Sequence, residues 1–200
     1  MTDQEFAELL TITRERFGIE CKGPGPLTDR QLLAQVVRAA LGMANRRDGG
    51  IIIVGMEDNG SVLKPVGIID TDLATWKFDQ VADRIAEYAD PYISFELESR
   101  FHEGKTYVVI NVHEFEEIPV LCKKDYQGIL RRGACYVRTR RKPETTEIPS
   151  QAEMRDLLDL ANEKGVRKFV TQAQAAGLDI SGAEPPTDQE LYDQQLGDLK

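Results

Sequence analysis

Along this chain, some segments show the hydrophobic period of a helix and others show that of a strand. Apolar residues recur at helical spacing from 32 to 44 and again from 73 to 88. Strict alternation at 93–101, followed by a turn and a second apolar run, predicts a hairpin. The apolar run at 51–55 predicts a strand that is buried on both faces. These elements predict an α+β fold with a mixed β-sheet flanked by helices.

The same patterns divide the chain into three parts. Residues 1–148 contain the predicted sheet and its helices and are expected to form one domain. Residues 149–177 carry apolar positions at helical spacing, so we expect a C-terminal helix that packs on the domain or extends from it. Residues 178–200 contain six acids, one lysine and a proline pair, which predicts a mobile acidic tail.

The glycine pair at 49–50 tests whether the chain contains a phosphate-binding loop. A dinucleotide site or a P-loop needs its glycines after a strand and at the start of a helix, where backbone amides face the phosphate. Here the order is reversed, because a predicted helix precedes the glycines and a strand follows them. We interpret Gly49 as a helix terminator in front of a core strand.

Composition restricts the class of protein. Two hundred residues are enough to bury a core without disulfides, and no apolar run approaches the roughly 20 residues that cross a bilayer. The acidic start lacks the pattern of a signal peptide. Cys21, Cys122 and Cys135 are far apart and show no metal-finger spacing. We expect reduced thiols in a cytoplasmic protein without a membrane segment.

Charge is segregated along the chain. The formal net charge of -9 argues against a nucleic-acid partner, but residues 123–142 contain eight basic residues and one acid. Arginine forms bidentate hydrogen bonds with phosphate and stacks on bases, so this segment predicts contact with nucleic acid. The alternative is a solvent-exposed strand face whose charges pair with nearby acids. The candidate contacts are Arg46, Arg47, Lys123, Lys124, Arg131, Arg132, Tyr136, Arg138, Arg140 and Arg141.

Two segments carry candidate catalytic carboxylates. Glu20 and Lys22 share one face of the predicted strand "FGIECK", Glu15 lies five residues before Glu20, and Asp58 follows the buried strand. If the two strands are neighbours, Glu15, Glu20 and Asp58 could hold Mg²⁺ or Mn²⁺, with Lys22 beside a substrate phosphate. The alternatives stay open: Lys22 can simply neutralise Glu20, and Asp58 can be an ordinary turn former.

The stretches "ERFGIECK", "ALGMANRRDGGIIIVGMEDNG" and "IPVLCKKDYQGILRRGACYVRTR" together resemble the Schlafen-type AlbA-like domain over roughly residues 15–148. Nuclease members of that family are metal-dependent endoribonucleases that cut structured RNA such as tRNA. Their acidic triad matches Glu15, Glu20 and Asp58. Here "ECK" replaces the usual Glu-Phe-Lys and keeps both charges. The active relatives have two lobes, so the resemblance implies a homodimer for a chain with one.

The resemblance and the residues leave three functions open. The leading hypothesis is a divalent-metal-dependent endoribonuclease that acts on tRNA-like RNA through the three carboxylates. Because many family members keep the fold without shown nuclease activity, the second is a non-catalytic nucleic-acid-binding or transcription-regulatory module. The third is an ATP-binding or nucleotide-binding protein, against which the missing phosphate loop speaks.

Overall fold

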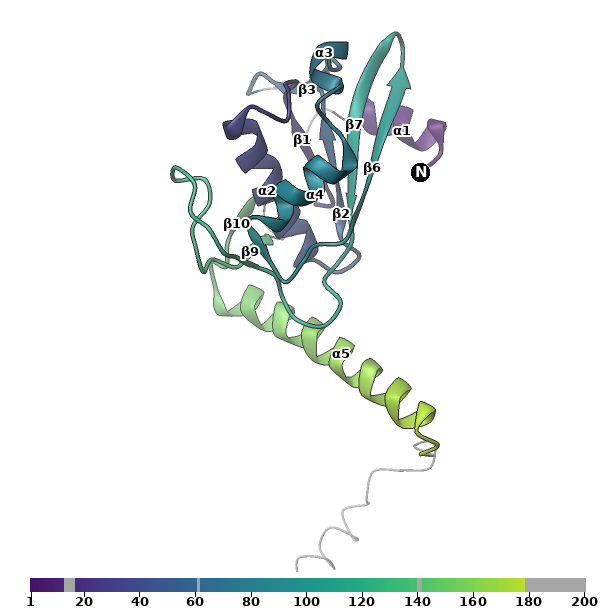
Figure 1. The fold of residues 1–200 in the computed structure, drawn as a ribbon, viewed down its shortest axis with the longest axis vertical. Coiled ribbons are helices and arrows are strands. Elements are labelled where there is room, and N and C mark those ends of the chain that lie inside the picture. The colour runs from purple at the N-terminus through teal and green to yellow at the C-terminus, as the bar shows by residue number, and fades with distance from the viewer. Residues whose placement is uncertain (13–16, 61, 140–141, 179–200) are drawn as a thin grey trace, which may run out of the picture. The chain divides into compact units, whose positions relative to one another are not determined.

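The computed structural model describes residues 1–12, 17–60, 62–139 and 142–178 of the chain. Its centre is a four-stranded sheet in the order β1-β2-β7-β6 (Figure 1). The strands are β1 (Ile19–Lys22), β2 (Gly50–Val54), β7 (Lys105–Val112) and β6 (Phe95–His102). β1 runs parallel to β2, and the other two pairings are antiparallel. The fold is therefore α+β with a mixed sheet, as the sequence predicts.

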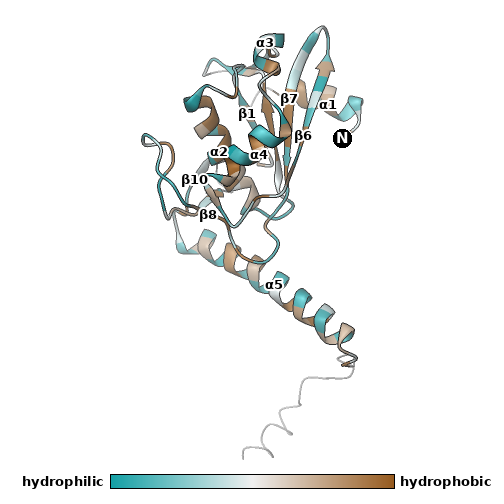
Figure 2. Ribbon diagram, viewed as in Figure 1, coloured by the Kyte–Doolittle hydropathy of each residue, from teal (hydrophilic) through white to brown (hydrophobic). Residues whose placement is uncertain are grey.

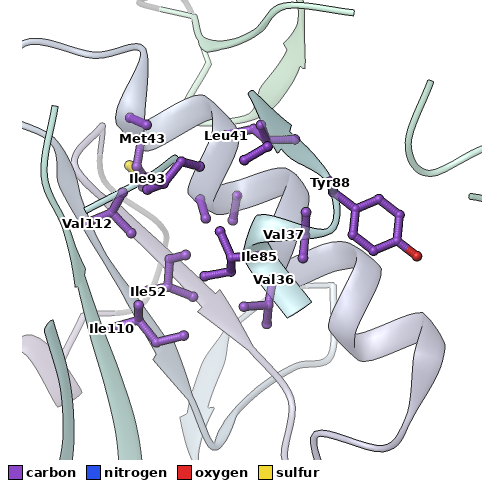
Figure 3. Close-up of a cluster of buried hydrophobic side chains, with 14 of the residues drawn as sticks. Val36, Val37, Leu41, Met43, Ile52, Ile85, Tyr88, Ile93, Ile110 and Val112 are labelled. Carbon is purple, nitrogen blue, oxygen red and sulfur yellow. The ribbon is translucent and has the colours of Figure 1, made fainter. Parts of the chain in front are cut away.

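Each face of the sheet has its own hydrophobic core. On one face lie α2 (Arg30–Ala44) and α4 (Phe78–Ala86), which pack on alternate residues of β2 and β7. Figure 3 shows side chains of both helices meeting sheet residues such as Ile52 and Ile110. α1 (Asp3–Leu10) covers the other face, against residues such as Ile53. Because neighbouring strand residues point to opposite faces, β2 must be apolar throughout.

The helix boundaries follow local chemistry. Asp29 caps α2, and its Oδ1 accepts hydrogen bonds from the amides of Gln31 and Leu32 at 2.8 and 3.2 Å. The helix predicted after residue 70 divides into α3 (Asp70–Leu73) and α4, which corrects the expectation of one continuous helix. Trp76 lies between them, and its indole Nε1 donates to the carbonyl of Gly25 at 2.9 Å.

Several short strands flank the main sheet. β3 (Met56–Asp58) pairs with β4 (Leu63–Pro65), and β5 (Ala89–Asp90) pairs with β8 (Leu121–Cys122). β9 (Tyr136–Arg138) pairs with β10 (Thr145–Glu147). At the end of α2 the side chain of Asn45 donates to the carbonyls of Val120 and Tyr136 at 2.8 and 2.9 Å and accepts from the amide of Val120 at 2.7 Å. This buried side chain fastens the β9–β10 hairpin to the helix.

The chain forms two compact units, Met1–Ala161 and Asn162–Lys200, so the boundary falls inside α5 (Gln151–Ala175). Leu157 and Leu160 belong to the core of the first unit. Figure 2 shows hydrophobic residues concentrated on α2 and the inner strands, whereas α5 alternates between polar and apolar residues. The predicted tail lies outside the described residues, apart from Leu178. No helix in the described part of the chain is long and apolar enough to span a membrane.

Candidate nucleic-acid interface and carboxylate site

Glu20 and Lys22 lie on the α2 face of β1, the edge strand of the sheet. Their neighbours Ile19 and Cys21 point to the opposite face, into the core beneath α1. This placement follows from the two-residue period of a strand and confirms that Cys21 turns away from the charged pair.

Two cations hold the Glu20 carboxylate. Lys22 Nζ lies 2.5 Å from Glu20 Oε1, and the Arg138 guanidinium donates to Oε2. Arg138 also donates to the carbonyls of Ile19 at 2.9 Å and Phe17 at 3.2 Å. The Arg138 side chain is 0% exposed and that of Glu20 is 10% exposed. This buried, fully hydrogen-bonded pair fixes the start of β1 to β9.

A pocket of about 480 Å³ opens beside this pair. Glu20 and Lys22 form part of its wall, α2 contributes Gln35 and Arg38, and the opposite wall includes Glu144. The pocket is polar and carries charges of both signs, with Lys22 at a position where it could meet a phosphate oxygen.

Arg38 is a pocket residue that sequence reasoning missed. Its Nη2 donates to the carbonyl of Thr145 at 2.8 Å, and its guanidinium lies 5.4 Å from the centroid of the Tyr136 ring. Arg38 Nε and Thr145 Oγ1 are buried without a hydrogen-bond partner in the described part of the chain. The only sequence signal was a basic residue between the buried positions Val37 and Ala39.

Asp58 lies at the end of β3 and is exposed. Its Oδ1 accepts a hydrogen bond from the amide of Gly60 at 2.7 Å, which is the turn-forming contact considered as the alternative. In the strand register Glu20 lies opposite Ile52. Ile52 precedes Asp58 by six residues in the sequence. A straight strand of that length would span about 20 Å.

The chain does not continue straight between these positions. Gly55 has a φ of 108°, and its amide donates to the carbonyl of Lys22 at 2.9 Å. The end of β1 therefore meets the bend at Gly55 that leads into β3.

The third carboxylate, Glu15, lies outside the described residues, so the complete triad stays a prediction. Among the residues that the structure describes, no three His, Cys, Asp or Glu side chains are grouped so that they could hold a metal ion. Both Glu20 oxygens already accept hydrogen bonds from cations. A divalent ion at Glu20 would have to use the lone pairs that these hydrogen bonds leave on the carboxylate or take the place of Lys22 Nζ, because the Arg138 side chain has no exposed surface.

Several of the predicted nucleic-acid contacts lie on the surface. Arg47, Lys123 and Arg132 are exposed. Two others are exposed within ion pairs: Arg131 Nε lies 2.8 Å from Glu147 Oε1, and Lys124 pairs with Glu87. The hydrogen bond to Glu147 raises the pKa of Arg131, and the bond to Glu87 raises the pKa of Lys124. Exposed pairs of this kind are weak in water, so phosphate can compete for both cations.

Other predicted contacts lie inside the domain. Tyr136 is 2% exposed, and its hydroxyl accepts from the amide of Arg131 at 2.9 Å and donates to the carbonyl of Ile129 at 3.3 Å. Arg138 is buried against Glu20, as described above. A base could reach Tyr136 or Arg138 only if the hairpin rearranged, so these two contacts stay predictions. Arg140 and Arg141 lie outside the described residues.

Arg46 is held against the aromatic ring of Phe17. Its guanidinium carbon lies 4.7 Å from the ring centroid, and Nη1 donates to the carbonyl of Gly49. Arg46 is half-buried, whereas Arg47 beside it is exposed. Both arginines thus place positive charge at the end of α2, and the contacts of Arg46 fix the orientation of its guanidinium.

Two of the cysteines, Cys122 and Cys135, are poor nucleophiles. Burial raises the pKa of Cys135 to about 11 and also raises the pKa of Cys122. A thiol with so high a pKa forms little thiolate at neutral pH. All three cysteines are free thiols in the structure.

A family profile described as "Schlafen, AlbA_2" matches residues 18–147. A comparison with proteins of curated function found no match. Among solved structures, the DIP2311 protein from Corynebacterium diphtheriae is similar with 17% identity and a TM-score of 0.49; the match covers 73% of this chain and 26% of that one. The N-terminal domain of a RecG-related protein from Nitrosomonas europaea has 23% identity and a TM-score of 0.46, with coverage of 66% and 88%.

Proposed function

The chain belongs to the Schlafen AlbA_2 family, and we propose that it is a divalent-metal-dependent endoribonuclease that acts on structured, tRNA-like RNA. The family relationship indicates a nucleic-acid-related function, and the cleavage step is the proposal. The observation that carries it is the open pocket at the edge of the sheet, where Glu20 and Lys22 project from one strand face. In metal-dependent phosphodiester cleavage, carboxylates hold the ion, and an ammonium group can neutralise charge on the phosphate.

In this proposal Glu15, Glu20 and Asp58 would hold Mg²⁺ or Mn²⁺. The ion would supply a polarised water and would stabilise the leaving oxygen of the phosphodiester. Lys22 would lie beside the scissile phosphate and neutralise the charge that develops on its oxygens. Arg138 would hold the Glu20 carboxylate in place, and the exposed Arg47, Lys123 and Arg132 would bind the RNA backbone.

A second function, nucleic-acid binding without cleavage, is favoured by one specific observation. Both oxygens of Glu20 already accept hydrogen bonds from Lys22 and Arg138, so the carboxylate has a complete structural role without a metal. Such a protein would bind nucleic acid through the same basic residues, with strong salt dependence and without a metal-dependent product.

Asp58→Asn tests the proposal, because Asp58 is exposed and its removal leaves no buried charge unpaired. Glu57→Gln is the matched control, since Glu57 is the adjacent exposed acid of the same strand. Each protein is incubated with a tRNA pool and Mn²⁺ or a chelator, and the products are resolved on a denaturing gel. We expect Asp58→Asn to lower the cleavage rate at least about 100-fold while RNA binding persists.

Glu57→Gln should cleave at the wild-type rate. If the wild-type protein binds tRNA but yields no metal-dependent product, the enzymatic proposal fails and the binding function remains. Equal cleavage by Asp58→Asn and the wild type would exclude Asp58 from the site. The substitution Glu20→Gln is preferable to Glu20→Ala, because the amide oxygen can still accept a hydrogen bond from Arg138.

A further inference from the structure

The first turns of α5 and the arginines at the end of α2 line one pocket of about 700 Å³. Arg46 and Arg47 contribute positive charge to its wall, and acids that include Glu153, Asp156 and Asp159 contribute negative charge. We propose that the start of α5 is an autoinhibitory cover, whose carboxylates weaken the binding of nucleic-acid phosphates at Arg46 and Arg47. The inference rests on the proposed nucleic-acid binding and names the regulation of that surface.

Helix geometry places two of the acids beside the leucines that anchor α5. Glu153, Asp156 and Leu157 occupy positions i, i+3 and i+4 of α5, so they share one helix face, and Leu160 extends that face by one turn. Leu157 and Leu160 are each 4% exposed and belong to the core of the first unit. The two leucines therefore anchor the acidic turns to the domain, and the carboxylates are presented from a fixed helix.

The arginine side of the pocket is also held in place. The ring of Phe17 and the carbonyl of Gly49 fix the Arg46 guanidinium, whose Nε is buried without a hydrogen-bond partner in the described part of the chain. Arg47 is exposed next to it. A guanidinium oriented in this way is prepared to receive an anionic oxygen.

Carboxylates and phosphates compete for the same guanidinium donors. Acids in the wall of the pocket lower the positive potential that an approaching phosphate meets, and they do so most strongly where solvent is partly excluded. The basic surface at the end of α2 would thus bind phosphate with reduced affinity. Neutralising the acids should restore the affinity, because phosphates can then contact Arg46 and Arg47.

The test compares the wild type with Glu153→Gln/Asp156→Asn/Asp159→Asn in binding to tRNA, measured by fluorescence anisotropy from 50 to 200 mM salt at about neutral pH without divalent metal. We expect the triple variant to bind about threefold to tenfold more tightly, as three weak electrostatic interactions allow. The salt dependence should also steepen by about 0.7–0.9 logarithmic units for each additional phosphate contact.

Two controls make the test specific. Asp79→Asn/Asp83→Asn/Glu103→Gln makes the same change in net charge at exposed acids outside this pocket; it should change affinity less and leave the salt slope unchanged. In an Arg47→Gln background the α5 substitutions should produce a smaller gain, because one of the competed-for cations has been removed. Since Glu153 also accepts a hydrogen bond from Ser150, the Asp156→Asn/Asp159→Asn pair repeats the measurement with that contact intact.

The outcomes separate the two proposals. If the wild type binds tRNA and the α5 variants, once shown to be folded by circular dichroism, bind equally well, the autoinhibitory cover is excluded and the binding function stands. An equal gain in the control triple variant would also exclude it, because net charge alone would explain the effect. If neither the wild type nor any variant binds, the proposed function fails and the cover falls with it.

Discussion

At the scale of single residues, the buried guanidinium of Arg138 makes a structural contact with Glu20. Arg138 has no exposed side-chain surface, and it joins Glu20 to two backbone carbonyls of the segment before and within β1. A buried ion pair adds little net stability, because desolvation offsets the attraction, but the loss of one partner leaves an uncompensated charge. Substitutions at Glu20 therefore perturb folding as well as any chemistry at the site.

A double-mutant cycle at this pair should show strong coupling. We expect Glu20→Leu to lower the free energy of unfolding by about 3–5 kcal/mol, because it leaves the buried guanidinium without a counter-charge. The double variant Glu20→Leu/Arg138→Met should lose much less than the sum of the two single variants. Urea unfolding followed by circular dichroism measures all four proteins.

Arg131→Met is the control for this cycle, since it removes an exposed partner of Glu147 and should change stability little. Additive losses at Glu20 and Arg138 would show that the two side chains are not coupled in solution. That result would make Arg138 available again as a contact for nucleic acid.

The sequence predicts part of this residue-scale picture. The strand period places Glu20 and Lys22 on one face and turns Cys21 away, because strand geometry is local. The second partner of Glu20, Arg138, lies 118 positions away, and no local pattern indicates that pairing. Arg38 and Asn45 were missed for the same reason: their hydrogen-bond partners, Thr145 and Val120, come from segments that only the tertiary fold brings together.

At the scale of elements, segments with a regular hydrophobic period are predicted well, and segments shaped by irregular tertiary contacts are not. α2, β2 and the β6–β7 hairpin appear where the sequence predicts them, because each has a long, clean hydrophobic pattern. The helical pattern over residues 73–88 predicts one helix, but the structure interrupts it between α3 and α4, where Trp76 donates to the carbonyl of Gly25. Tertiary contacts override helical propensity at that point.

Truncation tests where the folded domain ends. The sequence predicts a domain to residue 148 and a following helix that packs on it or extends from it, and Leu157 and Leu160 of that helix are buried in the core of the first unit. We expect a chain that ends at residue 161 to unfold at nearly the same urea concentration as the full chain. A chain that ends at residue 148 should lose about 3–6 kcal/mol, because burial of each leucine contributes about 1.5–3 kcal/mol.

Leu158→Ala in the full chain is the control, because Leu158 lies between the two anchors and is exposed. If the chain that ends at residue 148 is as stable as the one that ends at residue 161, the start of α5 is not a structural part of the domain. The acidic turns would then be free to leave the arginines.

At the scale of the whole molecule, the charge distribution bears on assembly. Each chain carries a formal net charge of -9, so two free chains repel each other at low ionic strength. The basic residues that remain exposed are local, and RNA phosphates can neutralise them. The resemblance to two-lobed nucleases implies a pair of lobes around one RNA, and RNA can supply the attraction that the free chains lack.

We therefore predict that structured RNA promotes pairing of this chain. Sedimentation velocity should show mainly a species near 22.5 kDa for the free protein in low salt, and a complex of two chains per RNA when a tRNA is added. Asp58→Asn should assemble in the same way, because it leaves the basic surface unchanged, and with Mn²⁺ it keeps the RNA intact during the measurement. A saturated complex of one chain per tRNA would contradict the pairing and would require a single lobe to bind the RNA alone.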